Sequence, residues 1–212
     1  MVMAEATNHY FKHLGVSDGL SQVCIPSIYQ DELGAVWLGT TEGLNRYNGK
    51  DVRVFQPSES NHGLTNNEIN ELCGDKNGRM YIRSGNDLIK LDIYTEQFTC
   101  LRQKGVYGLF CKKDTLWVSC ADGIYYYTGQ GTELTFFARV QKGFVGRALY
   151  VDRETVWVVT RKYLVAISRE DPLRQEILLT LDKGNCILGD SSGNIWVLSL
   201  IHISEPTRPR LI

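Results

Sequence analysis

Several features that identify common protein classes are missing from this 212-residue chain. No two cysteines have CxxC spacing, which excludes zinc-ribbon and thioredoxin-type motifs. No apolar run approaches the roughly 18 residues that a membrane-spanning helix needs. There is no Lys/Arg run and the net charge is −1, so no nucleic-acid partner is expected. The four histidines are scattered along the chain, and no segment shows a sustained helical period.

A short block with the pattern D-x-x-G-x-hydrophobic-aromatic recurs along the chain. Complete copies begin at Asp31, Asp75 and Asp190, and two further copies lack the turn glycine. The aromatic residues that anchor the five copies are Trp37, Tyr81, Trp117, Trp157 and Trp196. Their spacings of 44, 36, 40 and 39 residues, with several short strands in each unit, are typical of a β-propeller.

Each repeat is expected to supply four antiparallel strands. The first strand precedes the Asp turn, at 25–30, 69–74, 106–111, 146–151 and 185–189. The second carries the aromatic anchor, and a tight turn then leads to a third strand that begins near Leu44, Leu88, Ile124 and Leu164. The fourth strands are expected at 52–56, 98–102, 134–138 and 176–180. Gly, Asn and Asp at the turns, with β-branched and aromatic residues between them, favour this assignment.

The aspartate of each turn is expected to accept backbone N–H groups, and the glycine to take a positive φ. The aromatic anchor is expected to be buried between neighbouring blades. Because the carboxylate recurs at one turn position, it is interpreted as structural; a catalytic carboxylate would occur once or twice, in its own environment.

The fold class predicted is all-β, an incomplete β-propeller of about four blades plus the first hairpin of a fifth. The segments "DGLSQVCIPSI" and "HGLTNNEINEL" match at an offset of 44, which also places Phe11 on Phe55. By this alignment, "HYFKHL" corresponds to the outer strand of a blade whose other strands would precede it. The arc of blades is therefore expected to be open.

The two ends of the chain carry separate expectations. Residues 1–6 resemble the remnant of a signal peptide, with a small-residue cleavage pattern at Ala4-x-Ala6. Residues 7–197 are assigned to the partial propeller. From Leu198 the repeat pattern stops, and "LSLIHISEPTRP" looks like a translated sequencing adapter. Residues 198–212 are thus expected to be non-native, and the chain to be a gene fragment.

The six cysteines leave two interpretations open. They are Cys24, Cys73, Cys100, Cys111, Cys120 and Cys186. Most lie in apolar strand-like runs, which favours free thiols that pack as small hydrophobes. A disulfide in an oxidising compartment is the alternative, but the sequence cannot pair them.

The block from Tyr29 to Phe55 and the lead-in "YFKHLGVSDGLSQ" resemble the two-component regulator propeller repeat. Together they look like the start of the sensor region of a hybrid two-component system. The resemblance is strong over Tyr10–Phe55, weakens through the third and fourth repeats and ends near Val197. It implies a periplasmic sensor, anchored at the inner membrane, that binds oligosaccharides released from glycans and controls genes for carbohydrate use.

The resemblance also implies that the full-length protein is a histidine kinase and a homodimer, whereas this region holds no kinase domain and is not itself an enzyme. Its expected partners are an unidentified oligosaccharide and the rest of the sensor propeller. The alternatives are a propeller-fold glycan lyase or hydrolase, or a protein-interaction scaffold. No cofactor, metal or catalytic residue is expected.

A ligand-binding rim is predicted at the turns between the second and third strands of the blades. Ligands of propellers tend to meet loops at one rim of the central channel, and these turns differ between repeats while the flanking strands match. Their polar residues are Thr41, Glu42, Asn86, Asp87, Asp122, Arg161 and Lys162. Arg161 and Lys162 could pair with a carboxylate or sulfate group on an acidic sugar.

Overall fold

The computed structural model describes residues 12–57, 63–141 and 144–199, and this part is almost entirely antiparallel β-sheet. A single turn of 3-10 helix, η1 (Val16–Asp18), precedes the strands. Four sheets have four strands each and follow the chain order from one edge to the other, while a fifth has two strands. None of the helical segments described is long and apolar enough to span a bilayer.

The strands lie where the repeat pattern predicts them. The first blade comprises β1 (Ser27–Gln30), β2 (Val36–Thr40), β3 (Gly43–Tyr47) and β4 (Val52–Phe55). The second comprises β5 (Ile69–Gly74), β6 (Arg79–Ser84), β7 (Asp87–Asp92) and β8 (Gln97–Arg102). The third comprises β9 (Val106–Lys112), β10 (Thr115–Cys120), β11 (Gly123–Tyr127) and β12 (Thr135–Ala138). The fourth comprises β13 (Gly146–Val151), β14 (Thr155–Thr160), β15 (Tyr163–Ser168) and β16 (Gln175–Thr180), and the last hairpin is β17 (Gly184–Gly189) with β18 (Ile195–Ser199).

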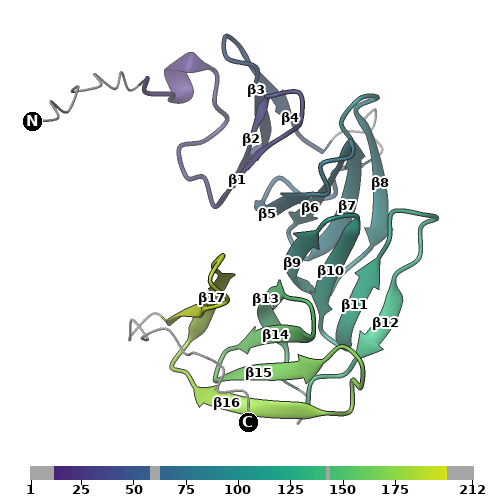
Figure 1. Ribbon diagram of the computed structural model, residues 1–212. Coiled ribbons are helices and arrows are strands. Elements are labelled where there is room, and N and C mark those ends of the chain that lie inside the picture. Colours follow the sequence, from purple (N-terminus) through teal and green to yellow (C-terminus); the bar gives the residue numbers. More distant parts are fainter. Residues whose placement is uncertain (1–11, 58–62, 142–143, 200–212) are drawn as a thin grey trace, which may run out of the picture.

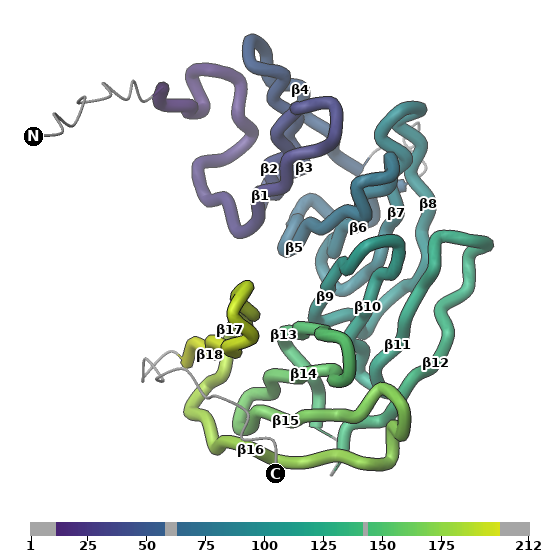
Figure 2. The backbone as a smooth tube through the Cα atoms, in the orientation of Figure 1, coloured from purple at the N-terminus to yellow at the C-terminus, as the bar shows by residue number. Residues whose placement is uncertain are grey.

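The blades are arranged around an open arc. The first strands of successive blades contact one another in the order β1, β5, β9, β13 and β17, and they line the inside of the arc (Figure 1). The backbone trace shows the same arrangement, with the arc open between β17–β18 and the first blade (Figure 2). The predicted fold class, an incomplete β-propeller of four blades plus a hairpin, is confirmed.

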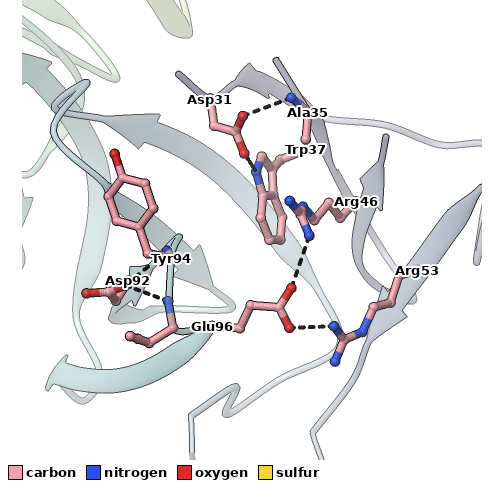
Figure 3. A network of polar contacts seen from close by, with 9 residues as sticks. Asp31, Ala35, Trp37, Arg46, Arg53, Asp92, Tyr94 and Glu96 are labelled. Carbon is pink, nitrogen blue, oxygen red and sulfur yellow. Dashed lines mark hydrogen bonds and ion pairs between the residues drawn. The ribbon is translucent and has the colours of Figure 1, made fainter. Parts of the chain in front are cut away.

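The aspartate of the repeat holds both its turn and its aromatic anchor. In the first blade, one carboxylate oxygen of Asp31 accepts the backbone N–H groups of Leu33 and Ala35 at 3.0 and 2.8 Å. The other oxygen accepts the indole N–H of Trp37 at 2.7 Å (Figure 3). Asp31 is buried, and Gly34 has φ +86°, as the turn requires. The backbone role was predicted, but the bond to the indole was not.

The same arrangement recurs in other blades, including one that lacks the turn glycine. Asp190 accepts the amides of Ser192 and Asn194 and the indole N–H of Trp196. In the fourth blade, Asp152 accepts two amides and the indole N–H of Trp157 across a shorter turn. The link between carboxylate and indole is therefore independent of the glycine.

A row of side chains on the face of blade 1 joins it to blade 2. Strand pairing places Trp37 opposite Arg46, and Arg46 opposite Arg53. Arg46 lies over the Trp37 ring at 5.5 Å and forms an ion pair of 3.1 Å with Glu96, which belongs to the turn between β7 and β8. Arg53 pairs with the other oxygen of Glu96 (Figure 3). The first two blades are thus joined by packing at the tryptophan and by charge toward the outer strand.

The first strands of neighbouring blades meet at a fixed position in the repeat. Tyr29 of β1 packs against Gly74 of β5, and Tyr150 of β13 packs against Gly189 of β17. A Cβ atom on either glycine would overlap the tyrosine ring, so only glycine admits the large residue there. Where β5 meets β9, the equivalent residues are Cys73 and Cys111, each small.

The five aromatic anchors are equivalent in register, as predicted. Their partners in the first strands are Tyr29, Cys73, Phe110, Tyr150 and Leu188. The anchors of the four complete blades are at most 6% exposed, because the following blade covers them. Trp196 of the last hairpin is 43% exposed, since no further blade of the described chain packs on its face.

Some expectations about the chain ends lie outside the described residues. These are the signal-peptide remnant at 1–6, residues 9–11 of "HYFKHL", and residues 200–212 of the segment expected to be non-native. Lys12–Leu14 are described and do not form a strand. Leu198 and Ser199 are also described, and both belong to β18.

Replacing Trp37 by alanine should lower the free energy of unfolding by about 3–5 kcal/mol, because the ring is fully buried between two blades. The matched control is Trp196→Ala, which removes the equivalent but half-exposed ring and should cost about 1 kcal/mol. Urea unfolding followed by circular dichroism measures both. Equal losses in the two variants would contradict the assigned packing between blades.

Candidate ligand-binding rim

The predicted site residues lie at the turns that connect the second and third strands of each blade. These turns share one end of the blades with the segments that lead from one blade to the next. Backbone bonds join the two sets: Val106 donates to the carbonyl of Asn86, Ala121 to that of Gly105, and Leu181 to that of Lys162. The turns therefore form one rim of the propeller, tied to the connections between blades.

A hydroxyl group at the end of the second strand donates to a backbone carbonyl, either in the turn or in the connection between blades. Thr40 donates to the carbonyl of Gly43 at 2.8 Å, and Thr160 donates to that of Tyr163 at 3.0 Å. Ser84, at the same place in blade 2, donates to the carbonyl of Asn66 in the connection between blades. Ser199 is the equivalent residue of β18 and donates to Asp182. This hydroxyl lies three residues after each anchor, a signal that the sequence contains but that was not recognised.

Two of the predicted ligand-binding carboxylates are used by the fold. Asp87 accepts the backbone N–H of Lys104 at 2.6 Å, which fixes the connection to blade 3. Asp122 forms an ion pair of 2.7 Å with Arg102 and accepts the hydroxyl of Tyr125 at 2.8 Å. Partial burial opposes ionisation, but the bonds from Arg102 and Tyr125 hold the pKa of Asp122 below its ordinary value. Both residues have a structural task independent of any ligand.

The other predicted side chains belong to separate blades. Thr41 and Glu42 lie in the turn of blade 1, Asn86 in blade 2, and Arg161 with Lys162 in blade 4. All but the half-buried Thr41 are exposed. Within the described part of the chain, no hydrogen bond or ion pair joins any two of the seven predicted residues. The structure therefore places them on one rim without gathering them into a single cluster.

A half-buried carboxylate on the inner strands was not predicted. Glu71 of β5 accepts the backbone N–H of Leu109 in β9 at 3.1 Å and the Nε of Arg83 at 3.3 Å. Arg83 also donates to the carbonyl of Gly85, at the rim. Burial raises the pKa of Glu71 to about 7, against the opposing effects of Arg83 and Leu109. Glu71 thus connects the inner strands of blades 2 and 3 with a group that titrates near neutral pH.

The carboxylate oxygens of the repeat are occupied by hydrogen bonds within the turns. Asp31, Asp152 and Asp190 each accept two amides and an indole N–H. In the ranges 12–57, 63–141 and 144–199 there is no group of three or more His, Cys, Asp or Glu side chains that could hold a metal ion. The acidic residues that recur are therefore structural parts of the turns.

The radial sheets and the repeated aspartate–tryptophan turn define a β-propeller with four-stranded antiparallel blades. Residues 19–42 match the family model of the two component regulator propeller. The chain therefore carries a repeat of that family, and the resemblance predicted from the sequence is confirmed. The chain is also 38% identical over 53 residues to histidine kinase P4 of Formosa agariphila. This match covers 25% of the chain and 4% of that protein.

Solved structures share the fold over most of this chain. One is the extracellular domain of a protein named as a hybrid two component system from B. thetaiotaomicron, with a TM-score of 0.77 and 22% identity. A second, from a protein named as a one component system of the same organism, has a TM-score of 0.72 and 19% identity. Each match covers 89% of this chain, which spans only 29% and 30% of those domains. Streptogramin B lyase is similar at a TM-score of 0.64 and 15% identity, so the fold also occurs in enzymes.

The pKa of Glu71 predicts a dependence of stability on pH. Its ordinary value is 4.5, so between about pH 4.5 and 7 the folded protein binds the proton more tightly than the unfolded chain does. Ionisation of Glu71 therefore destabilises the fold as the pH rises through this window, and the effect is constant above pH 7. Glu71→Gln keeps an acceptor but cannot ionise. The Tm of the wild type minus that of this variant should fall from pH 4.5 to 7 and then stay level.

The control for this measurement is Glu68→Gln, which alters an exposed carboxylate in the same region. Its Tm should follow the wild type at every pH. A wild-type-minus-variant difference that is the same at pH 4.5 and pH 7 for Glu71→Gln would show that folding does not raise the pKa of Glu71.

Proposed function

We propose that this chain is part of the sensor region of a hybrid two-component system, in which a propeller detects an extracellular ligand. The observation that carries the proposal is the two component regulator propeller repeat at residues 19–42, within a fold similar to the extracellular domain of such a system. The match to a histidine kinase over 53 residues supports the same assignment. A periplasmic location at the inner membrane follows from this role.

The full-length protein is, on this proposal, a homodimeric histidine kinase, and the region described here performs no catalysis of its own. The proposal that this region performs no catalysis is supported by the recurring carboxylates, which are used in the hydrogen bonds of the turns. The propeller supplies a rigid frame, and the signal depends on what the rim binds.

The ligand that we propose is an oligosaccharide derived from a glycan. Support comes from the variable polar turns at the rim, where hydroxyl, carboxylate, amide and cationic groups alternate between blades. Arg161 and Lys162 are adjacent, exposed and of one sign, which suits a carboxylate or sulfate group of an acidic sugar. Neutral sugars would rely instead on the uncharged groups, such as Thr41 and Asn86.

The test of ligand binding requires a complete sensor region that contains this chain. Isothermal titration against a panel of neutral and acidic oligosaccharides should give saturable binding of at least one sugar. For an acidic ligand, replacing both Arg161 and Lys162 by alanine should weaken binding more than tenfold, or about 1.4 kcal/mol.

The matched control for this test replaces Arg153 and Arg174 by alanine. These two exposed residues belong to the turns at the opposite end of the same blade, and their loss should leave the affinity unchanged. Equal affinity in the wild type and the Arg161/Lys162 variant would remove this rim as the site. No binding by any sugar in the panel would contradict the proposed ligand class.

We also propose that a further blade of the sensor packs against the last hairpin. Leu188 and Trp196 form an apolar face there and are 63% and 43% exposed. The equivalent anchors Trp37, Tyr81, Trp117 and Trp157 are covered by the next blade. The face therefore has the composition and position of a blade interface.

Acrylamide quenching of tryptophan fluorescence tests this partner. The contribution of Trp196, obtained by comparison with Trp196→Phe, should be readily quenched in the 212-residue chain and protected in the complete sensor region. Equal quenching of Trp196 in both proteins would refute the proposed contact.

A further inference from the structure

Two cysteines from neighbouring blades meet at the inside of the propeller. Cys73 lies in β5 of blade 2, and Cys111 lies in β9 of blade 3. Their sulfur atoms are 2.6 Å apart, and the residues are 38 positions apart in the chain. This separation is only slightly longer than a covalent S–S bond of about 2.05 Å. Both side chains are half-buried and pack against the core cluster between blades 2 and 3.

The contact follows from the repeat rather than from a chance approach of two side chains. Cys73 is the residue opposite the aromatic anchor Tyr81, as Tyr29 is opposite Trp37. At this position, the first strand of one blade directs its side chain at a fixed residue of the next blade, as Tyr29 is directed at Gly74. Cys111 occupies the place of Gly74 in the following blade. The backbone geometry that brings Tyr29 onto Gly74 therefore brings the two thiols together.

No other pair of cysteines has this relationship. All six lie in the described part of the chain, and Cys73 with Cys111 is the one pair in sulfur–sulfur contact. Cys24 and Cys186 are exposed, Cys120 is buried and Cys100 is half-buried. All six cysteines are free thiols in the structure, and Cys73 with Cys111 is the one pair placed for a disulfide bond.

We propose that Cys73 and Cys111 form a disulfide bond that links the inner strands of blades 2 and 3. The oxidant is a disulfide compound of the glutathione type, written RSSR. One cysteine thiolate attacks RSSR, which forms a mixed disulfide and releases one RS⁻ that takes up the thiol proton. The second cysteine loses its proton, attacks the protein sulfur of the mixed disulfide and releases the other RSH. Two protein thiols are oxidised, and one RSSR is reduced to two RSH.

The contact between the two sulfur atoms favours closure of the bond. Burial, together with the bond to Cys111, raises the pKa of the Cys73 thiol well above its ordinary value, which lowers its thiolate fraction. The 2.6 Å separation opposes this effect, because the second attack occurs between groups that are already in contact.

Mapping of the disulfide is the direct test. The 212-residue chain is equilibrated with reduced and oxidised glutathione at a poise of about −200 mV. It is then denatured, alkylated and analysed by mass spectrometry. Intact mass should show four alkylated thiols instead of six, and proteolysis should yield a linked peptide that contains Cys73 and Cys111. Six alkylated thiols, or a linkage between other cysteines, would overturn the proposal.

Thermal unfolding gives a second readout with matched variants. The oxidised protein should melt about 10 °C above the reduced protein, because the bond restricts the unfolded chain. Cys73→Ser and Cys111→Ser should each abolish this difference. Cys100→Ser, which alters a half-buried cysteine without a sulfur neighbour, should retain it. A difference that survives in Cys73→Ser would show that another bond is responsible.

Discussion

The hydrogen bonds of one aspartate hold the turn and the tryptophan together in blades 1 and 4 and in the last hairpin. A buried carboxylate needs compensation, and Asp31 obtains it from two backbone amides and the indole of Trp37. The same three bonds therefore close the turn between the first two strands and orient the largest side chain of the interface. Once the indole is oriented, Arg46 can lie over it and reach Glu96 of the next blade. The same hydrogen bonds thus fix both the turn and the orientation of the indole, and Asp152 and Asp190 repeat this arrangement.

The third blade shows what happens when this carboxylate is missing. Lys112 stands where the aspartate would be, and Lys113 turns the chain with φ +52°. Trp117 is still only 5% exposed, and it packs against Tyr126 and Phe137 at ring distances of 5.6 and 5.0 Å. Aromatic packing replaces the polar link here, so the position of the anchor is determined by the sheet as well as by the turn.

The repeat pattern predicted the fold because its signals are local. Turn residues, alternation along a strand and an aromatic at a constant offset all act within about ten residues, and the strands lie within a few residues of the predicted limits. Contacts between blades could not be predicted from these local signals. The position of Glu71 against Leu109 and the meeting of Cys73 with Cys111 join residues whose relation depends on how one blade stacks on the next.

The candidate rim illustrates the same limit. Its location followed from strand order, and the turns do lie at one end of the blades. Which side chains remain available there could not be predicted, because the ion pair of Asp122 with Arg102 spans two blades. Asp87 likewise caps the backbone of the connection at Lys104. Variation between repeats thus reflects structural tasks at some positions and leaves others, such as Arg161, free of them.

The packing of the inner strands has a consequence for how such a chain can change over time. Tyr29 requires Gly74 in the next blade, and Tyr150 requires Gly189, because a larger residue at either glycine would overlap the tyrosine ring. The blades are therefore not interchangeable modules, although they share one backbone. A duplication of blade 1, for example, would place Tyr29 against Gln30, the residue at the position of Gly74, unless that residue changed as well. The order of these blades is thus constrained by pairs of residues on their inner strands.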